Sequence, residues 1–175
     1  MHKIILAISI ITVMSACSPK FDWREMHGTD SPYTVLMPAK PSEQTREIRL
    51  GPQTTNMHMT AAQIDGVSFA VGAAKMNDAT QAQLTLAIIK SALLQKMQGQ
   101  ITDEKNSVTN TDGKVTFNEE FAVTSSNTNG AVSPTRMQGR LVARNEWVYQ
   151  VLVVGPEKDI NKESAETFLT SFKPL

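Results

Sequence analysis

The sequence predicts an α+β fold, in which a mainly antiparallel sheet of about six to seven strands is covered by a long middle helix and a C-terminal helix. Turn dipeptides separate stretches of alternating polarity, a pattern typical of β-hairpins. A stretch with helical periodicity, 79–98, interrupts the strands, and a second follows the last strand from about Asn161. Hairpin strands pair antiparallel, and both helices must bury their apolar sides against that sheet.

Three hairpins are expected around pairs of turn-forming residues. Asp65-Gly66 and Asp112-Gly113 suit tight turns because these residue types tolerate a positive φ. A third hairpin is expected around Asn145-Glu146, ahead of the strand 147–154. That strand is apolar on both faces except at Gln150, which predicts a central position with both faces covered.

The two helices differ in the width of their apolar faces. The segment 79–98 has no proline and no internal glycine, and its wide apolar stripe predicts a largely buried helix that stops at Gly99. The strand before it, 67–74, carries a face of small side chains, which would let this helix approach the sheet closely. In the C-terminal helix a single apolar face is expected to pack on the sheet; it consists of Ala165, Phe168, Leu169 and Phe172.

The N-terminal segment has the organisation of an export signal. Lys3 precedes an apolar run, 4–13, which is too short for a stable transmembrane helix because a span needs about 20 apolar residues. Small residues follow at the expected cleavage position. We therefore expect a signal peptide at 1–16, a modified cysteine with a short tether at 17–20 and a single domain at 21–175.

The residues at this cleavage position resemble a bacterial lipobox. Ser15-Ala16-Cys17 follows the apolar run, although Met14 stands where leucine is usual. The resemblance implies that Cys17 is acylated, for example with palmitate, before the signal is cut. Ser18 stands where an aspartate would retain the protein at the inner membrane, so the resemblance favours the outer membrane, facing the periplasm. The alternative is an ordinary secretory signal in front of a free cysteine.

Composition excludes several classes of protein. Cys17 is the only cysteine, so neither an intramolecular disulfide nor a thiolate metal cluster can form. The chain has 17 basic residues (Lys and Arg) and 17 acidic residues (Asp and Glu). It therefore lacks the excess of basic residues that is typical of nucleic-acid-binding proteins.

Over nearly the whole mature domain, the chain resembles the Mog/PsbP-like superfamily. The residues that carry the resemblance are Tyr33-Thr34-Val35-Leu36-Met37-Pro38 with Pro41, the middle helix, Val148-Tyr149-Gln150 and the closing segment 168–172. The resemblance implies an α/β/α sandwich and a non-enzymatic accessory or binding role with varied partners. It supplies no functional residues and no cofactor.

Met57-His58-Met59 is the sharpest candidate for a metal site, because methionine and histidine are copper ligands. Alternation along a strand sends Met57 and Met59 to one face and His58 to the other, so one strand cannot bring all three to one ion. We therefore favour two core-facing methionines beside an exposed histidine. Copper handling through Met57 or Met59, with a ligand supplied by the fold, is the alternative.

Two further groups are candidates for catalysis. His27 with Asp30 and a serine would suit a hydrolase, but no nucleophile-elbow motif is present and a solvated loop histidine is the simpler interpretation. Glu119 and Glu120 would suit acid–base chemistry. A β-bulge or a sheet-edge charge explains that pair equally well, and we favour the bulge. A periplasmic enzyme with a site assembled from distant residues is the alternative function.

A row of arginines is the candidate interaction surface. Arg136, Arg140 and Arg144 share one strand face with Gln138. In a domain held near a membrane, such a row would suit anionic headgroups or an acidic envelope protein. It is otherwise a solvated face, paired with Glu119 or Glu120 on another strand. The sequence as a whole favours a membrane-anchored periplasmic lipoprotein with a non-enzymatic accessory or binding role.

Overall fold

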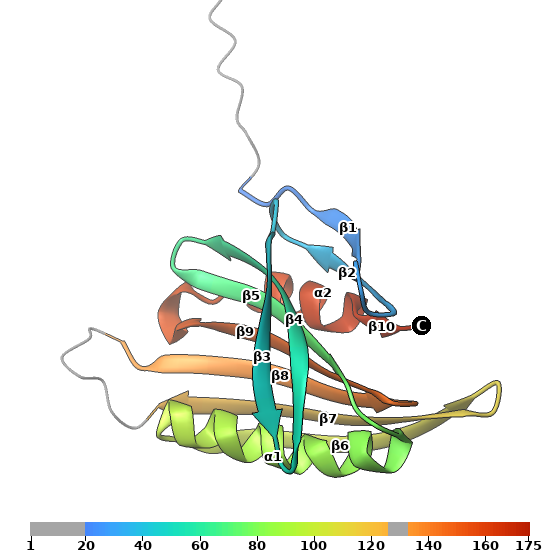
Figure 1. Cartoon of the computed structure of the whole chain (residues 1–175). Coiled ribbons are helices and arrows are strands. Elements are labelled where there is room, and N and C mark those ends of the chain that lie inside the picture. Colours follow the sequence, from blue (N-terminus) through green and yellow to red (C-terminus); the bar gives the residue numbers. More distant parts are fainter. Residues whose placement is uncertain (1–19, 126–132) are drawn as a thin grey trace, which may run out of the picture.

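The computed structural model describes residues 20–125 and 133–175 of the chain (Figure 1). They form a seven-stranded antiparallel sheet of order β3-β4-β5-β9-β8-β7-β6 and a three-stranded antiparallel sheet of order β1-β2-β10. In chain order the elements are β1 (Arg24–His27), β2 (Tyr33–Met37), β3 (Ser42–Leu50), β4 (Gln53–Ile64), β5 (Val67–Lys75), α1 (Ala79–Met97), β6 (Gly99–Thr111), β7 (Lys114–Ser125), β8 (Thr135–Arg144), β9 (Trp147–Pro156), the 3₁₀ turn η1 (Glu157–Asp159), α2 (Lys162–Ser171) and β10 (Lys173–Pro174).

The predicted fold class, an α/β/α sandwich in which two helices cover one sheet, is wrong. The protein is mainly β, with 58% of the described residues in strands and 21% in helices. The predicted single sheet is replaced by two antiparallel sheets. The second sheet forms because β2 pairs with β1 on one side and with the two-residue strand β10 on the other. The small sheet lies beside α2, so the helix and the small sheet together cover part of one face of the large sheet (Figure 1).

The three predicted hairpins are confirmed. Asp65 and Gly66 have φ values of 49° and 80°, and Asp112 and Gly113 have values of 54° and 75°. These left-handed conformations match the right-handed twist of the flanking strands. The third turn uses Asn145 with a φ of 51°, and its two strands, β8 and β9, pair in register.

β9 is the central strand of the large sheet, as its sequence predicts, and it contributes to two separate cores. Tyr149, Val151 and Val153 face α2 and the small sheet. Val148 and Leu152 face α1 on the opposite side. All five side chains are at most 7% exposed, so β9 holds the two cores together. Burial of apolar area on both faces is the main term that stabilises this sheet.

α1 covers the predicted residues but is buried on only one side. Asp78 caps its N-terminus by accepting a hydrogen bond from the Gln81 N–H at 2.8 Å. The left-handed residue at its C-terminus is Gln98, with a φ of 47°, and not the predicted Gly99, which already belongs to β6. The prediction of a largely buried helix is wrong, because Leu84 is 60% exposed. α1 lies mainly over β7, β8 and β9, and not over the small-residue face of β5.

α2 is fixed at both ends and in the middle. Asn161 caps its N-terminus by accepting from the Ser164 N–H at 2.8 Å. Phe168 is fully buried against Phe69 of β5, with the rings edge to face at 5.5 Å. Near the C-terminus the Ser171 hydroxyl accepts from the Leu36 N–H of β2 at 2.9 Å. Among the described residues, no helix has the length and apolar character needed to cross a membrane.

Candidate functional site

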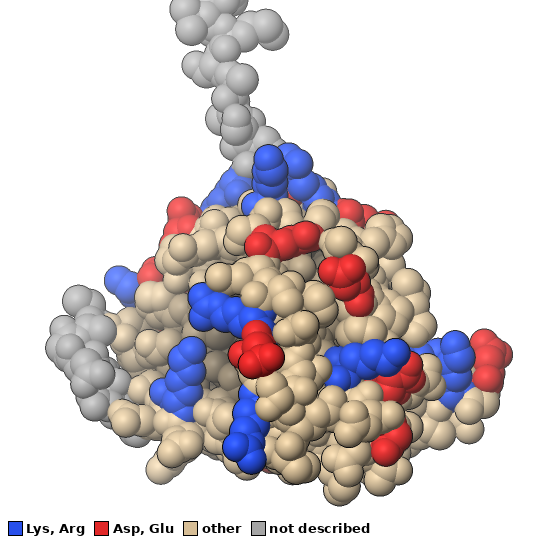
Figure 2. Space-filling model, viewed as in Figure 1, with Lys and Arg blue, Asp and Glu red and all other residues tan. Residues whose placement is uncertain are grey.

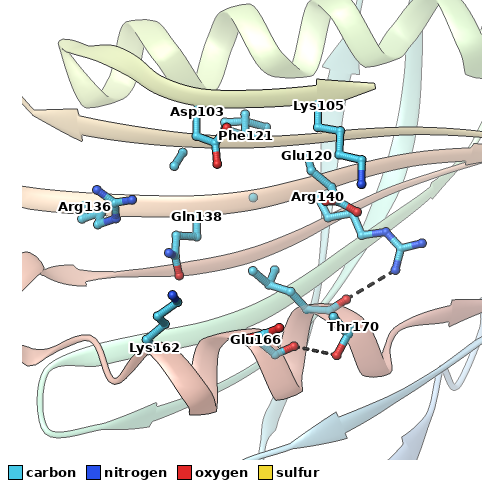
Figure 3. A pocket seen from close by; sticks show the side chains of 13 residues that line it. Asp103, Lys105, Glu120, Phe121, Arg136, Gln138, Arg140, Lys162, Glu166 and Thr170 are labelled. Atoms are coloured by element: carbon cyan, nitrogen blue, oxygen red, sulfur yellow. Dashed lines mark hydrogen bonds between the residues drawn. The ribbon is translucent and has the colours of Figure 1, made fainter. Parts of the chain in front are cut away.

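An open groove lies between α2 and the strands β6, β7 and β8 (Figure 3). Its volume is about 650 Å³. Seven charged side chains of both signs line it: Asp103, Lys105, Glu120, Arg136, Arg140, Lys162 and Glu166. Figure 3 shows them on both sides of the space between the helix and the strands. We regard this groove as the candidate functional site.

The groove exists because α2 and the small sheet cover only part of one face of the large sheet. Their core reaches β9 and Val142 of β8, but the rest of that face, over β6 and β7, stays uncovered. A β-bulge in β6 between Ile101 and Asp103 changes which side chains point to that face. Ile101 pairs with the buried Val123 on the α1 side, whereas Asp103 pairs with Ala122 on the groove side. The bulge therefore turns Asp103 and Lys105 toward the groove.

Arg140 is the most constrained of the three predicted arginines. Its guanidinium donates to the Asn118 Oδ1 at 2.8 and 3.3 Å and to the Phe172 carbonyl at 3.1 Å. It also donates to the Leu169 carbonyl at 3.4 Å and lies 5.9 Å from the Phe172 ring. A cation at these carbonyls stabilises the negative end of the α2 dipole. Burial lowers the pKa of Arg140, and the charge of Glu120 opposes that shift.

The other two arginines also have partners within the protein. Arg136 donates to Glu157 at 3.1 Å. Arg144 donates to the Thr116 hydroxyl at 2.9 Å, while its buried Nε has no partner among the described residues. Alternation correctly predicts that the three arginines share one face. The structure brings only Arg136 and Arg140 into the groove.

The residues that sequence reasoning missed are the free charges of the groove. Within 20–125 and 133–175, Asp103, Lys105, Lys162 and Glu166 form no ion pair. Lys105 lies opposite Glu120, which lies opposite Arg140, so charges alternate across three strands. The Asp112-Gly113 turn already implies that Lys105 faces Glu120, and this signal is present in the sequence. Nothing local in the sequence places Lys162 and Glu166 above these strands.

The methionine candidates lie on the α1 side of the sheet, away from the groove. Met57 and Met59 face the core and His58 faces the opposite side, as alternation predicts. The Gln150 side-chain N–H₂ lies 3.5 Å from the Met57 sulfur and 3.7 Å from the Met59 sulfur. The fold therefore brings an amide to the two thioethers. Nowhere in the described part of the chain do three or more His, Cys, Asp or Glu side chains gather in a way that could hold a metal ion.

The histidine candidates do not assemble a Ser-His-Asp site. His27 ends β1, and not a loop as predicted, and its side chain is 70% exposed at 3.6 Å from Glu25. Asp30 instead lies 3.7 Å from His58, whose Nδ1 is also 3.0 Å from the Thr45 hydroxyl.

The predicted bulge at the acidic pair is wrong. β7 pairs with β8 without a register shift from Thr116 to Thr124. Glu119 therefore points to the α1 side, where it lies 3.6 Å from Lys90 of α1. The same lysine binds Glu104, and its hydrogen bond lowers the pKa of that carboxyl. Glu120 points the other way, into the groove, so the two carboxylates do not act on one substrate.

Cys17, the predicted lipid-attachment residue, lies outside the described residues. A scan against protein-family models finds no match to this chain, and a search of functionally curated proteins finds none either. The resemblances to a lipobox and to the Mog/PsbP-like superfamily therefore stay predictions.

Proposed function

We propose that this chain is a lipid-anchored envelope protein with a non-enzymatic accessory role, and that it binds a protein partner in the groove beside α2. The observation that carries the proposal is the set of free charges in that groove. Asp103, Lys105, Lys162 and Glu166 line it without an ion pair among the described residues. Such groups are available to a ligand, whereas charges already paired within the protein are not.

The mixture of signs favours a ligand that carries both. Cations and anions alternate along the strand floor of the groove, from Lys105 through Glu120 to Arg140. A purely anionic ligand would meet the carboxylates of Asp103 and Glu166, and like-charge contacts disfavour binding. An exposed polar segment of another protein, with acidic and basic side chains, complements this pattern.

The anchor is supported by the N-terminal sequence and by the position of the first described residues. The apolar run 4–13 and Ser15-Ala16-Cys17 have the order of a lipoprotein signal. The Asp22 N–H already donates to the Pro38 carbonyl at 2.9 Å, so the folded domain begins a few residues after Cys17. Figure 2 shows Lys and Arg side chains gathered where the described chain begins, and Lys20 is one exposed example. We propose the outer membrane, facing the periplasm, as the location.

Site-specific photo-crosslinking in living cells tests the groove. A photoreactive amino acid at Gln138, inside the groove, is expected to capture a discrete envelope protein. The matched control carries it at Gln83 on the exposed side of α1, away from the groove. Adding Lys162→Glu is expected to reduce capture at Gln138 by about tenfold, because it replaces an attractive contact by a repulsive one. Equal capture at both positions, or capture that Lys162→Glu leaves unchanged, would contradict the groove as the binding site.

A further inference from the structure

The outer edge of β6 is an open end of the large sheet. β6 is the last strand in the sheet order, and no other described strand pairs with its outer side. Every residue from Gln100 to Thr111 is exposed. Along such an edge, alternate residues present backbone N–H and C=O groups that a further strand can pair with.

The C-terminal half of this edge, 106–111, lacks the features by which proteins block strand addition. Natural edges are protected by prolines, charges or bulges. The bulge of β6 lies before Asp103, and the segment from Asp103 to Thr111 pairs regularly with β7. The segment contains no proline, and 106–111 contains no charged residue. The opposite edge of the sheet, β3, is different because it carries two glutamates and two arginines among its nine residues.

Exposed apolar side chains accompany the free edge. Val108 is 63% exposed and lies directly opposite Phe117 of β7. Val115, on the same face, is 40% exposed. α1 lies mainly over β7, β8 and β9 and so does not cover this outer strip. A strand added to β6 would bury part of this apolar surface.

We propose that the occupant of this edge is a second copy of the chain, paired antiparallel through β6 about a two-fold axis at Ser107. Ser107 is the middle residue of the regular segment from Asp103 to Thr111. In this register Asn106 faces Val108 of the partner subunit, and Lys105 faces the partner's Thr109. The interface is isologous, which is the commonest form of dimer.

The length of the regular segment selects this register, and charge permits it: all nine residues from Asp103 to Thr111 pair with their copies only when the axis lies at Ser107. Residues that lie directly opposite each other in two paired strands point to the same face of the sheet. In a symmetric pair of identical strands, the two-fold axis therefore passes through a residue, which lies opposite its own copy. Centring on Glu104 or Lys105 would place identical charges against each other, which is unfavourable. Centring on Ser107 places every charged side chain of Asp103 to Lys105 opposite an uncharged Thr or Asn. It also brings the two Val108 side chains to diagonal positions on one face, where apolar side chains reach each other.

Cysteine cross-linking of the full chain in its native membrane tests the proposal. Ser107→Cys places one thiol from each subunit at the axis, and mild oxidation or a short bis-maleimide is expected to give mostly covalent dimer. Gln44→Cys, exposed on the opposite edge strand β3, is the matched control, and the wild-type chain accounts for any free thiol at Cys17. Adding Val108→Lys to Ser107→Cys is expected to reduce the dimer about tenfold, since it places two like charges at the diagonal positions. Val108 is exposed, so this substitution leaves the core intact.

Three results would overturn the proposal. The first is equal dimer yield from Ser107→Cys and Gln44→Cys. The second is cross-linking of the Ser107→Cys variant to a protein of different mass, which would identify a heterologous strand as the occupant. The third is a full chain that, solubilised in detergent at tens of micromolar, sediments only as a monomer. A specific dimer has a dissociation constant low enough to persist at that concentration. Ser107 lies on the groove face of β6, so a protein of different mass captured there counts as a strand on this edge only if adding Val108→Lys removes its cross-link. Val108 points to the other face of β6, and Val108→Lys alone is expected to leave photo-crosslinking from Gln138 in the groove unchanged.

Discussion

Replacing Arg140 by methionine is expected to lower the free energy of unfolding by about 2–4 kcal/mol. The substitution keeps an unbranched apolar stem in place of the aliphatic part of the arginine side chain but removes every donor. It leaves the buried Asn118 side chain and the last carbonyls of α2, at Leu169 and Phe172, without their partner. Urea unfolding followed by circular dichroism measures the loss.

Arg136→Met is the matched control for Arg140→Met. Arg136 lies on the same strand face, and its bond to Glu157 is part of an ion pair whose acidic partner is exposed. The control is therefore expected to cost at most about 1 kcal/mol. Arg140→Lys is expected to recover little of the stability, because a single ammonium cannot serve Asn118 and two carbonyls at once. Equal stabilities of Arg136→Met and Arg140→Met would show that Arg140 does not hold α2 in place.

Phe168→Ala is expected to cost about 3–5 kcal/mol. The ring is completely buried between α2 and the large sheet and contacts Phe69 edge to face. Its removal leaves a cavity at the point where the helix meets β5. The same helix supplies Lys162 and Glu166 to the groove, so we expect photo-crosslinking from Gln138 to weaken as well. Urea unfolding of the purified variant measures the loss of stability, and photo-crosslinking in cells that express the same variant measures the effect on the groove.

Glu163→Ala serves as the control for Phe168→Ala. Glu163 lies in the first turn of the same helix and is exposed. Its replacement is expected to change stability by no more than about 0.5 kcal/mol. If Phe168→Ala unfolds at the same urea concentration as this control, the packing of Phe168 between α2 and the large sheet does not stabilise the domain.

Local signals predicted the parts of the fold that depend on neighbouring residues. The turns at Asp65-Gly66 and Asp112-Gly113 and the helix 79–98 follow from positive φ and helical periodicity. The fold class was missed because the small sheet joins β1 and β2 to β10, which lies at the far end of the chain and is only two residues long. No local pattern identifies a strand of that length.

The candidate site was predicted only in part, for a similar reason. Alternation placed Arg136 and Arg140 on one face, but no pattern along the chain indicates which part of that face α2 covers. The role of Arg140 depends on the docking of α2, a contact between residues about 30 positions apart in the sequence. The bulge beside Thr102, which turns Asp103 into the groove, has no marker such as glycine.

The partner proposed for the groove is an envelope protein, so the proposed function depends first on the anchor. The most direct test is mass spectrometry of the mature N-terminus of the membrane-extracted protein. We predict a chain that begins at Cys17 and carries acyl chains, and a Cys17→Ser variant that incorporates no labelled palmitate. A mature chain that begins elsewhere, or a free and unmodified thiol at Cys17, would contradict the lipid anchor and with it the proposed location.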